Sequence, residues 1–173
     1  GADNVVTASI PNSASKSGST KSVNTEPGVE VASITKRSQQ AIKSSGASST
    51  DFRWPAEGRI ISRFGSKSGS STNDGIDISV PVGTPVKASQ KGTVIYAGSE
   101  LEDFGNLILV SHEGGWVSAY AHSSANLVKR GDKVSRGQVI AKSGRSGNAT
   151  VPKLHFELRK DSNPVNPLQH LAR

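Results

Sequence analysis

One short stretch of the chain, VPKLHFELRK at residues 151–160, places a histidine two positions after a lysine. In an extended strand successive side chains point to opposite faces, so His155 and Lys153 share a polar row while Leu154 and Phe156 share an apolar one. An imidazole on such a row can ligate a metal or move a proton. Taken alone, it is more often a hydrogen-bonded surface residue, and both interpretations stay open at this point.

The same two-face rule applies to two other phrases, GIDISV at residues 75–80 and WVSAYAH at residues 116–122. The first sets Asp77 opposite an apolar row. The second predicts one face formed by Val117, Ala119 and Ala121 and an outward face formed by Trp116, Ser118, Tyr120 and His122. If the three strands are neighbours in one sheet, Asp77, His122 and His155 lie in one groove. His112 and His170 are further candidates, and we expect His112 to be structural.

Short, glycine-punctuated strands must position these residues. Alternating and β-branched segments recur every 8–12 residues or so from residue 58 onwards, and no segment has helical periodicity over ten residues. This pattern predicts an all-β fold, an antiparallel β-sandwich-like domain. The expected strands are RIISRFG, GIDISV, TPVKA, GTVIYAG, NLILVSH, WVSAYAH, QVIAKSG and LHFELR.

The composition changes sharply near residue 52. All tryptophans, phenylalanines, tyrosines and histidines lie at or beyond Phe52, whereas the earlier residues are rich in Ser, Thr, Asn, Gly and Lys. Such a segment has too little apolar surface to offset the entropy lost on ordering. We therefore predict a Ser/Thr-rich, mostly irregular linker or tail at residues 1–51, with a possible short ordered segment at 29–42, followed by a folded domain at 52–173.

Charge and missing residue types exclude several classes of protein. The net charge is +7, but the basic residues are spread along the chain and no basic run is interleaved with aromatics, so we expect no nucleic-acid partner. There is no cysteine, hence no disulfide and no thiolate site. No apolar run is long enough to span a membrane. Because there is no methionine, we expect Gly1 not to be a translational start and the chain to be a fragment or a processed form.

Several phrases in the same order resemble one family, the LytM-like or lysostaphin-type zinc endopeptidases that cut peptidoglycan. They are WPAEGRIISRFG, GIDISVPVGTPVKASQKGTVIYAG, FGNLILVSHEGGWVSAYAH, VKRGDKVSRGQVIAKSGRSG and LHFELR with PVNPLQHL, and together they cover nearly all of residues 53–170. The resemblance implies an antiparallel β-domain with an open groove. It also implies a zinc site built from an H-x-G-x-D phrase and the second histidine of H-x-H, assisted by the first histidine of H-x-H and by the histidine of Y-A-H.

This chain departs from that pattern at two positions. NDGID keeps Asp77 but has Asn73 in place of the first ligand, and KLH keeps His155 but has Lys153 in place of the assisting histidine. Hydrolytic zinc needs three good ligands and a water, and an amide oxygen is a weak donor. The Lys153 ammonium repels a divalent cation and is expected to pair with Asp77 or another nearby acid. We therefore expect Asn73, Asp77 and His155 to be vestigial ligand positions, with no bound metal or cofactor and no catalytic residue.

The leading functional hypothesis is a degenerate LytM-like domain that is not an enzyme. It most resembles the NlpD, EnvC and DipM group, which implies a periplasmic location, an outer-membrane lipoprotein or envelope-associated full-length form, and activation of a zinc-dependent N-acetylmuramoyl-L-alanine amidase in cell division. The expected partner-binding groove comprises Asn73, Asp77, Trp116, Tyr120, His122, Lys153 and His155. The alternatives are a peptidoglycan-binding scaffold and an active zinc endopeptidase that recruits His112 or His170.

Overall fold

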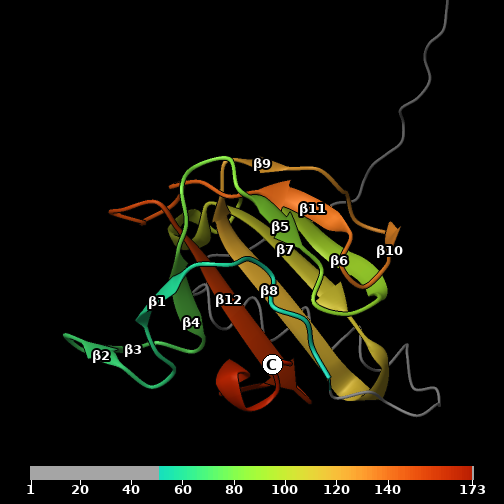
Figure 1. Cartoon of the computed structure of the whole chain (residues 1–173), viewed down its shortest axis with the longest axis horizontal. Coiled ribbons are helices and arrows are strands. Elements are labelled where there is room, and N and C mark those ends of the chain that lie inside the picture. Colours follow the sequence, from blue (N-terminus) through green and yellow to red (C-terminus); the bar gives the residue numbers. More distant parts are fainter. Residues whose placement is uncertain (1–50, 173) are drawn as a thin grey trace, which may run out of the picture.

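The computed structural model describes residues 51–172, which form two packed β-sheets and a small hairpin (Figure 1). The strands are β1 (Arg59–Ser62), β2 (Lys67–Ser68), β3 (Ser71–Thr72), β4 (Ile76–Ser79), β5 (Pro85–Lys87), β6 (Gly92–Gly98), β7 (Asn106–Ser111), β8 (Trp116–Ser123), β9 (Ala125–Asn126), β10 (Lys133–Val134), β11 (Val139–Lys142), β12 (Lys153–Lys160) and β13 (Asn163–Val165). Three single-turn 3₁₀ helices complete the list: η2 (Glu102–Phe104), η3 (Glu113–Gly115) and η4 (Pro167–Gln169).

The larger sheet has the strand order β1-β4-β12-β8-β7-β6-β10, and β13 pairs with β12 outside this path. All neighbouring strands are antiparallel. The two longest strands, β8 and β12, run side by side through its middle (Figure 1). The hairpin β2–β3 projects from one side of the molecule, between β1 and β4 (Figure 1).

One face of the larger sheet packs against the second sheet, whose order is β5-β11-β9. The main core lies between them, because the apolar row of every central strand points into this layer. It includes Ile76, Ile78, Val86, Ile108, Val110, Tyr120, Ile140, Leu154, Phe156 and Leu158. The opposite face carries a smaller cluster on β7 and β8, covered by Leu101 and Phe104. Strands β7 and β8 are therefore buried on both sides.

The two ends of the described chain close the domain together. Phe52, fully buried, forms a parallel bridge with Leu171, and the amide of Ala172 donates to the Phe52 carbonyl at 2.7 Å. The Trp54 indole nitrogen donates to the carbonyl of Ala172 at 2.8 Å. Residues that begin and end this domain thus complete the same edge of the core.

The fold expected from the sequence is confirmed. All eight expected strands are present, and the architecture is the predicted antiparallel β-sandwich. The pattern missed only the short strands β2, β3, β9, β10 and β13 and the 3₁₀ turns, which are too short to show a period. The possible ordered segment at 29–42 lies outside the described residues. Among residues 51–172 no helix is long and apolar enough to cross a membrane.

Candidate functional site

The outer face of the larger sheet carries a groove of about 440 Å³ where β4, β12 and the end of β8 meet. Its position follows from the strand register, in which His155 of β12 is paired with Asp77 of β4 on one side and with Ala121 of β8 on the other. The side chains that line the groove are Ser62, Ser66, Lys67, Ser68, Ser71, Thr72, Asn73, Asp74, Asp77, Asp103, Phe104, His122, Asn148, Lys153, His155 and Glu157.

The floor of the groove is a row of charged side chains along β12, and their signs alternate because Asp77 of β4 lies between Lys153 and His155. The Lys153 ammonium lies 2.9 Å from one oxygen of the Asp77 carboxylate, and His155 Nδ1 lies 2.7 Å from the other. His155 Nε2 is 2.9 Å from the Glu157 carboxylate, which also accepts a 2.9 Å bond from Arg159 Nε. The sequence left open whether Lys153 pairs with Asp77 or with another nearby acid, and the structure shows Asp77.

This row fixes the protonation state of His155. Carboxylates accept hydrogen bonds, and a neutral imidazole has only one N–H to donate, so two simultaneous bonds require the imidazolium form. Burial alone would lower the pKa of His155, but the hydrogen bonds and charges of Asp77 and Glu157 outweigh it and raise the pKa to about 9. Burial likewise opposes ionisation of Asp77, yet His155 and Lys153 lower its pKa to about 2.

Both ends of the Asn73 side-chain amide make hydrogen bonds to neighbouring residues. Its Nδ2 donates to the Ser62 hydroxyl at 2.8 Å, and its Oδ1 accepts the amide of Gly75 at 2.9 Å. The second bond is the local turn that an Asn side chain makes with the backbone two residues on. The amide therefore fastens the start of β4 and leaves its best acceptor engaged.

His122 enters the groove because the backbone bends at this residue. Strict alternation along β8 would place His122 on the core face, but its φ of +69° turns the side chain away from that register. Its Nδ1 donates to the carbonyl of Ser146 at 2.9 Å, and its ring centroid lies 6.1 Å from that of His155. Burial lowers the pKa of His122 to about 4, so it is a neutral imidazole beside a charged one.

The residues present do not fit the zinc ion that the fold family implies. Both ring nitrogens of His155 carry protons, the Asp77 carboxylate is bridged by two cations, and Asn73 supplies an engaged amide where an imidazole is needed. Within residues 51–172, no group of three or more His, Cys, Asp and Glu is arranged to hold a metal ion. The donor chemistry of this groove is that of an ion-pair network.

Two residues that the sequence placed in the groove lie elsewhere. Trp116 is 4% exposed and Tyr120 is fully buried, both in the main core on the opposite face of β8. The prediction was wrong because it took the face with polar atoms as the outer one. The Tyr120 hydroxyl is satisfied inside the core by Ser118 at 2.7 Å and by the amide of Ser89 at 2.9 Å, so it does not need solvent.

His112 and His170 also lie away from the groove. His112 is buried, with Nδ1 2.7 Å from the carbonyl of Lys91 and Nε2 2.8 Å from the Ser118 hydroxyl. The ring of His170 packs edge-on against Trp116, with 4.9 Å between centroids. Neither lines the groove, so the expectation that His112 is structural is confirmed and the recruitment of either histidine is not supported by their positions.

The sequence interpretation missed several groove residues. Glu157 shares the polar row of β12 with His155, and the alternation of LHFELR could have identified it. Phe104 is the aromatic side chain of the groove, with its ring centroid 6.1 Å from that of His155. Phe104 and Asp103 come from η2 and Asn148 from the loop before β12, and no sequence pattern signals their approach to β12.

The fold and this groove define a class: an antiparallel β-sandwich of the kind on which zinc peptidases are built, with charged side chains where the donors would stand. The sequence profile of Peptidase family M23 matches residues 71–167. The chain belongs to peptidase family M23.

Three relatives are similar to most of this chain. The "Lipoprotein NlpD/LppB homolog" of Pseudomonas aeruginosa is 48% identical over 122 residues, 70% of this chain and 40% of that protein. "Cell division protein DipM" of Caulobacter vibrioides is 45% identical over 128 residues, 70% of this chain and 21% of that protein. "Murein hydrolase activator NlpD" of Escherichia coli is 42% identical over 122 residues, which are 70% of this chain and 31% of that protein. The chain thus spans less than half of each.

A solved structure has the same fold. The putative peptidase M23 from Pseudomonas aeruginosa superimposes with a TM-score of 0.67 and 31% identity, covering 80% of this chain and 56% of that one. This similarity confirms the LytM-type β-domain expected from the sequence.

Proposed function

We propose that this chain is a non-catalytic M23 domain that binds and activates a periplasmic, zinc-dependent N-acetylmuramoyl-L-alanine amidase during cell division. The observation that carries the proposal is the Lys153–Asp77 ion pair, with 2.9 Å between ammonium and carboxylate. It places a fixed, hydrogen-bonded cation where a peptidase of this fold needs a metal and its water. The groove is lined mainly by polar and charged side chains, and the engagement of Asp77 and His155 in ion pairs supports a role in binding rather than in the activation of water.

The names of the relatives support a role in murein hydrolysis. One is named a murein hydrolase activator and another a cell division protein. The word lipoprotein in a third name is consistent with association with the cell envelope. An activator works by binding the active conformation of its target more tightly than the inactive one. A preformed groove of about 440 Å³ suits a protein segment that becomes accessible in that conformation.

The groove offers a specific set of contacts for such a segment. Phe104, rather than Trp116 or Tyr120, provides the aromatic side chain of the groove and can anchor a partner, since aromatic side chains in partly enclosed sites carry much of the energy of an interface. Asn73, Asp77, His122, Lys153 and His155 form the polar floor beneath it. Because these charges are already paired, the floor gives orientation more than raw affinity.

The test is dye release from labelled sacculi by a purified amidase of this class, with and without the chain. The chain should increase the release by the amidase and release no dye by itself. Asn148→Arg, at the mouth of the groove, should raise the concentration for half-maximal activation at least about tenfold, since one filled contact of about 1.4 kcal/mol has that effect. Asn148 is exposed, and its side chain makes no hydrogen bond within residues 51–172 that the substitution would remove.

Asn163→Arg on β13 is the matched control, because it makes the same chemical change on an exposed residue that does not line the groove. Absence of stimulation by the unmodified chain, or equal loss from the two arginine variants, would contradict the proposal. Dye release by the chain alone would instead support the endopeptidase alternative.

A further inference from the structure

A second cavity lies away from the groove and shares no lining residue with it. Its volume is about 620 Å³, and it is lined by Arg53, Trp54, Ala56, Glu57, Thr84, Pro85, Lys87, Arg136 and Ala172. Three of these side chains are basic and one is acidic. The cavity is therefore a positively charged hollow on a face of the domain that the proposed amidase groove does not use.

Backbone hydrogen bonds hold the walls of this cavity in place. The segment before β1 lies along β5: the amide of Lys87 donates to the Pro55 carbonyl and the amide of Arg53 donates to the Ser89 carbonyl, both at 2.8 Å. The Trp54 indole is fastened to Ala172 at 2.8 Å. The turn before β11 joins them, because the amide of Gly137 donates to the Ala88 carbonyl at 2.8 Å. Four distant segments thus build one rigid hollow.

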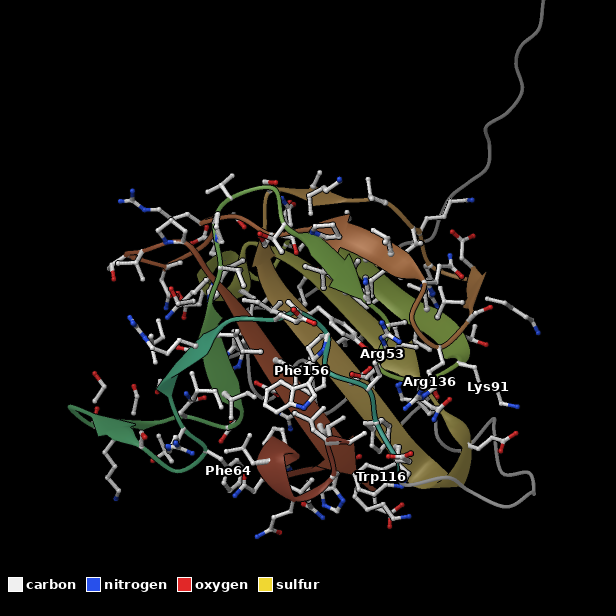
Figure 2. All side chains as sticks on the ribbon, in the orientation of Figure 1. Arg53, Phe64, Lys91, Trp116, Arg136 and Phe156 are labelled. Atoms are coloured by element: carbon white, nitrogen blue, oxygen red, sulfur yellow. The ribbon has the colours of Figure 1, made fainter. Side chains whose placement is uncertain are left out.

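The basic side chains of this hollow have few counterions. Among residues 51–172, neither Arg53 nor Lys87 has a carboxylate within ion-pair distance, and Arg136 has only Asp51 at 3.9 Å, an exposed pair of little energetic value. Arg53 lies against the turn at Gly137, where a Cβ would be 3.6 Å from its guanidinium atoms. Figure 2 shows Arg53 and Arg136 next to one another beside β5.

We infer that this cavity binds murein, through the carboxylates of its peptides and the apolar face of a sugar. Guanidinium groups match carboxylates in charge and geometry. The half-buried indole of Trp54 offers an apolar ring beside them, and aromatic rings pack well against the C–H face of a pyranose. An acidic protein segment would use the cations but has less need of the indole. The inference rests on the proposed function only for the identity of the polymer.

The murein site has a role that differs from that of the groove. A domain that contacts the wall through one face and a partner through another concentrates that partner on its substrate, since tethering replaces a bimolecular encounter. Because the two cavities share no residue, both can be occupied at once. Binding to the wall should therefore be independent of the amidase.

The experiment measures cosedimentation of the 173-residue chain with purified sacculi in the absence of amidase. The cavity variant combines Arg53→Gln, Lys87→Gln and Arg136→Gln, and the control combines Arg130→Gln, Lys133→Gln and Lys142→Gln. Both lower the net charge from +7 to +4, and the control residues are exposed and line neither cavity. The cavity variant should bind at least about tenfold more weakly, and the control less than about threefold.

A second variant changes the affinity in the opposite direction. Glu57→Gln removes the acidic side chain of the cavity and should tighten binding to sacculi about two- to threefold, through reduced repulsion of carboxylates. A soluble disaccharide–tetrapeptide should compete with the sacculi, whereas an uncharged chitin tetrasaccharide should not. Each result can be read without any amidase, so it stands or fails separately from the proposed activation.

Three outcomes would overturn the inference. Equal weakening of the cavity and control variants would show a general charge effect. Tight binding of polyglutamate, with no competition by the muropeptide, would identify an acidic protein as the ligand. Binding to vesicles of phosphatidylglycerol that depends on the same arginines, without binding to sacculi, would identify a lipid surface.

Discussion

At the scale of single residues, Lys153 decides whether the groove can bind a metal ion. It supplies one positive charge within 2.9 Å of Asp77, so the carboxylate needs no metal to balance it. It also has a flexible stem that fills space. A histidine at this position would instead offer a lone pair. The exchange of one side chain therefore turns a donor site into a closed ion pair.

The energetic link between Lys153 and Asp77 can be measured by a double-mutant cycle. Lys153→Met should lower the free energy of unfolding by about 1–3 kcal/mol, because the pair is largely buried and its loss leaves Asp77 with one partner. Asp77→Asn should also destabilise, and the double variant should cost less than the sum. Urea unfolding at pH 7 gives these values. Lys129→Met is the control, because Lys129 forms an exposed pair with Asp132, and it should change the stability by less than about 0.5 kcal/mol. Additive effects of Lys153→Met and Asp77→Asn would contradict the coupling.

The donor set can also be restored. Asn73→His with Lys153→His replaces the amide and the ammonium by two imidazoles, and the double variant should take up about one zinc per chain. The single variant Asn73→His should bind much less zinc, because the Lys153 ammonium still neutralises the Asp77 carboxylate. Metal analysis of dialysed protein gives the ratio. Asn73→Gln with Lys153→Gln is the matched control without imidazoles, and zinc uptake by this control would show that binding arises elsewhere.

At the scale of elements, β8 links the groove to a buried hydrogen-bond chain. The amide of Ser89 donates to the Tyr120 hydroxyl, Tyr120 donates to Ser118, and Ser118 donates to His112 Nε2. The order of donors is fixed at its end, where His112 Nδ1 must donate to the carbonyl of Lys91. This series of hydrogen bonds requires the neutral form of His112. Burial disfavours the charged form and lowers the pKa of His112 to about 4.

Acid should therefore destabilise the domain through His112. The unfolded chain binds a proton at this residue below about pH 6.5, but the folded chain does so only near pH 4, so the free energy of unfolding falls as the pH falls between these values. The loss from this residue is at most about 3 kcal/mol. Denaturant unfolding at pH 7, 6, 5 and 4 measures it.

Two variants isolate this contribution from that of the carboxylates and the other histidines. His112→Gln should have a shallower dependence on pH than the unmodified chain over pH 6.5 to 4. Tyr120→Phe shortens the hydrogen-bond chain and lowers the stability by about 1–3 kcal/mol, but it keeps His112 and so should retain the slope. Equal slopes in all three proteins would contradict the assignment.

At the scale of the whole molecule, the domain closes where its first and last described residues meet. The core begins at Phe52, which is fully buried and packs with its ring centroid 5.0 Å from that of Trp116. Leu171 completes the same corner through its bridge to Phe52. Within residues 51–172, every residue of this core lies at or after residue 52.

Deletion of residues 1–50 should therefore leave the melting temperature within about 2 °C of the full chain, since every core contact described within residues 51–172 is kept. Deletion of residues 1–54 is the matched control. It also removes Phe52 and Trp54 and should lower the melting temperature by about 10 °C or more, because loss of one buried aromatic alone costs about 3–5 kcal/mol. Calorimetry compares the three chains. A large loss with the first deletion would show that the domain starts earlier than predicted.

The sequence by itself determined the strands and the faces of β4 and β12. Both follow from the two-residue period of an extended chain, which is local. The pairing of Lys153 with Asp77 or another nearby acid was expected only because the family resemblance placed these residues in one site, and the structure decided for Asp77. The outer face of β8 did not follow, because burial of Tyr120 depends on partners at Ser89 and Ser118.

Only the tertiary structure decided the face of β8, the reason why His122 enters the groove and the existence of the second cavity. Which side of a strand becomes core depends on where the second sheet packs, and that surface is made by residues far along the chain. The bend at His122 is one dihedral angle, invisible in a pattern. The cavity at Arg53 and Arg136 joins four segments whose approach is fixed by backbone hydrogen bonds, and no spacing in the sequence encodes it.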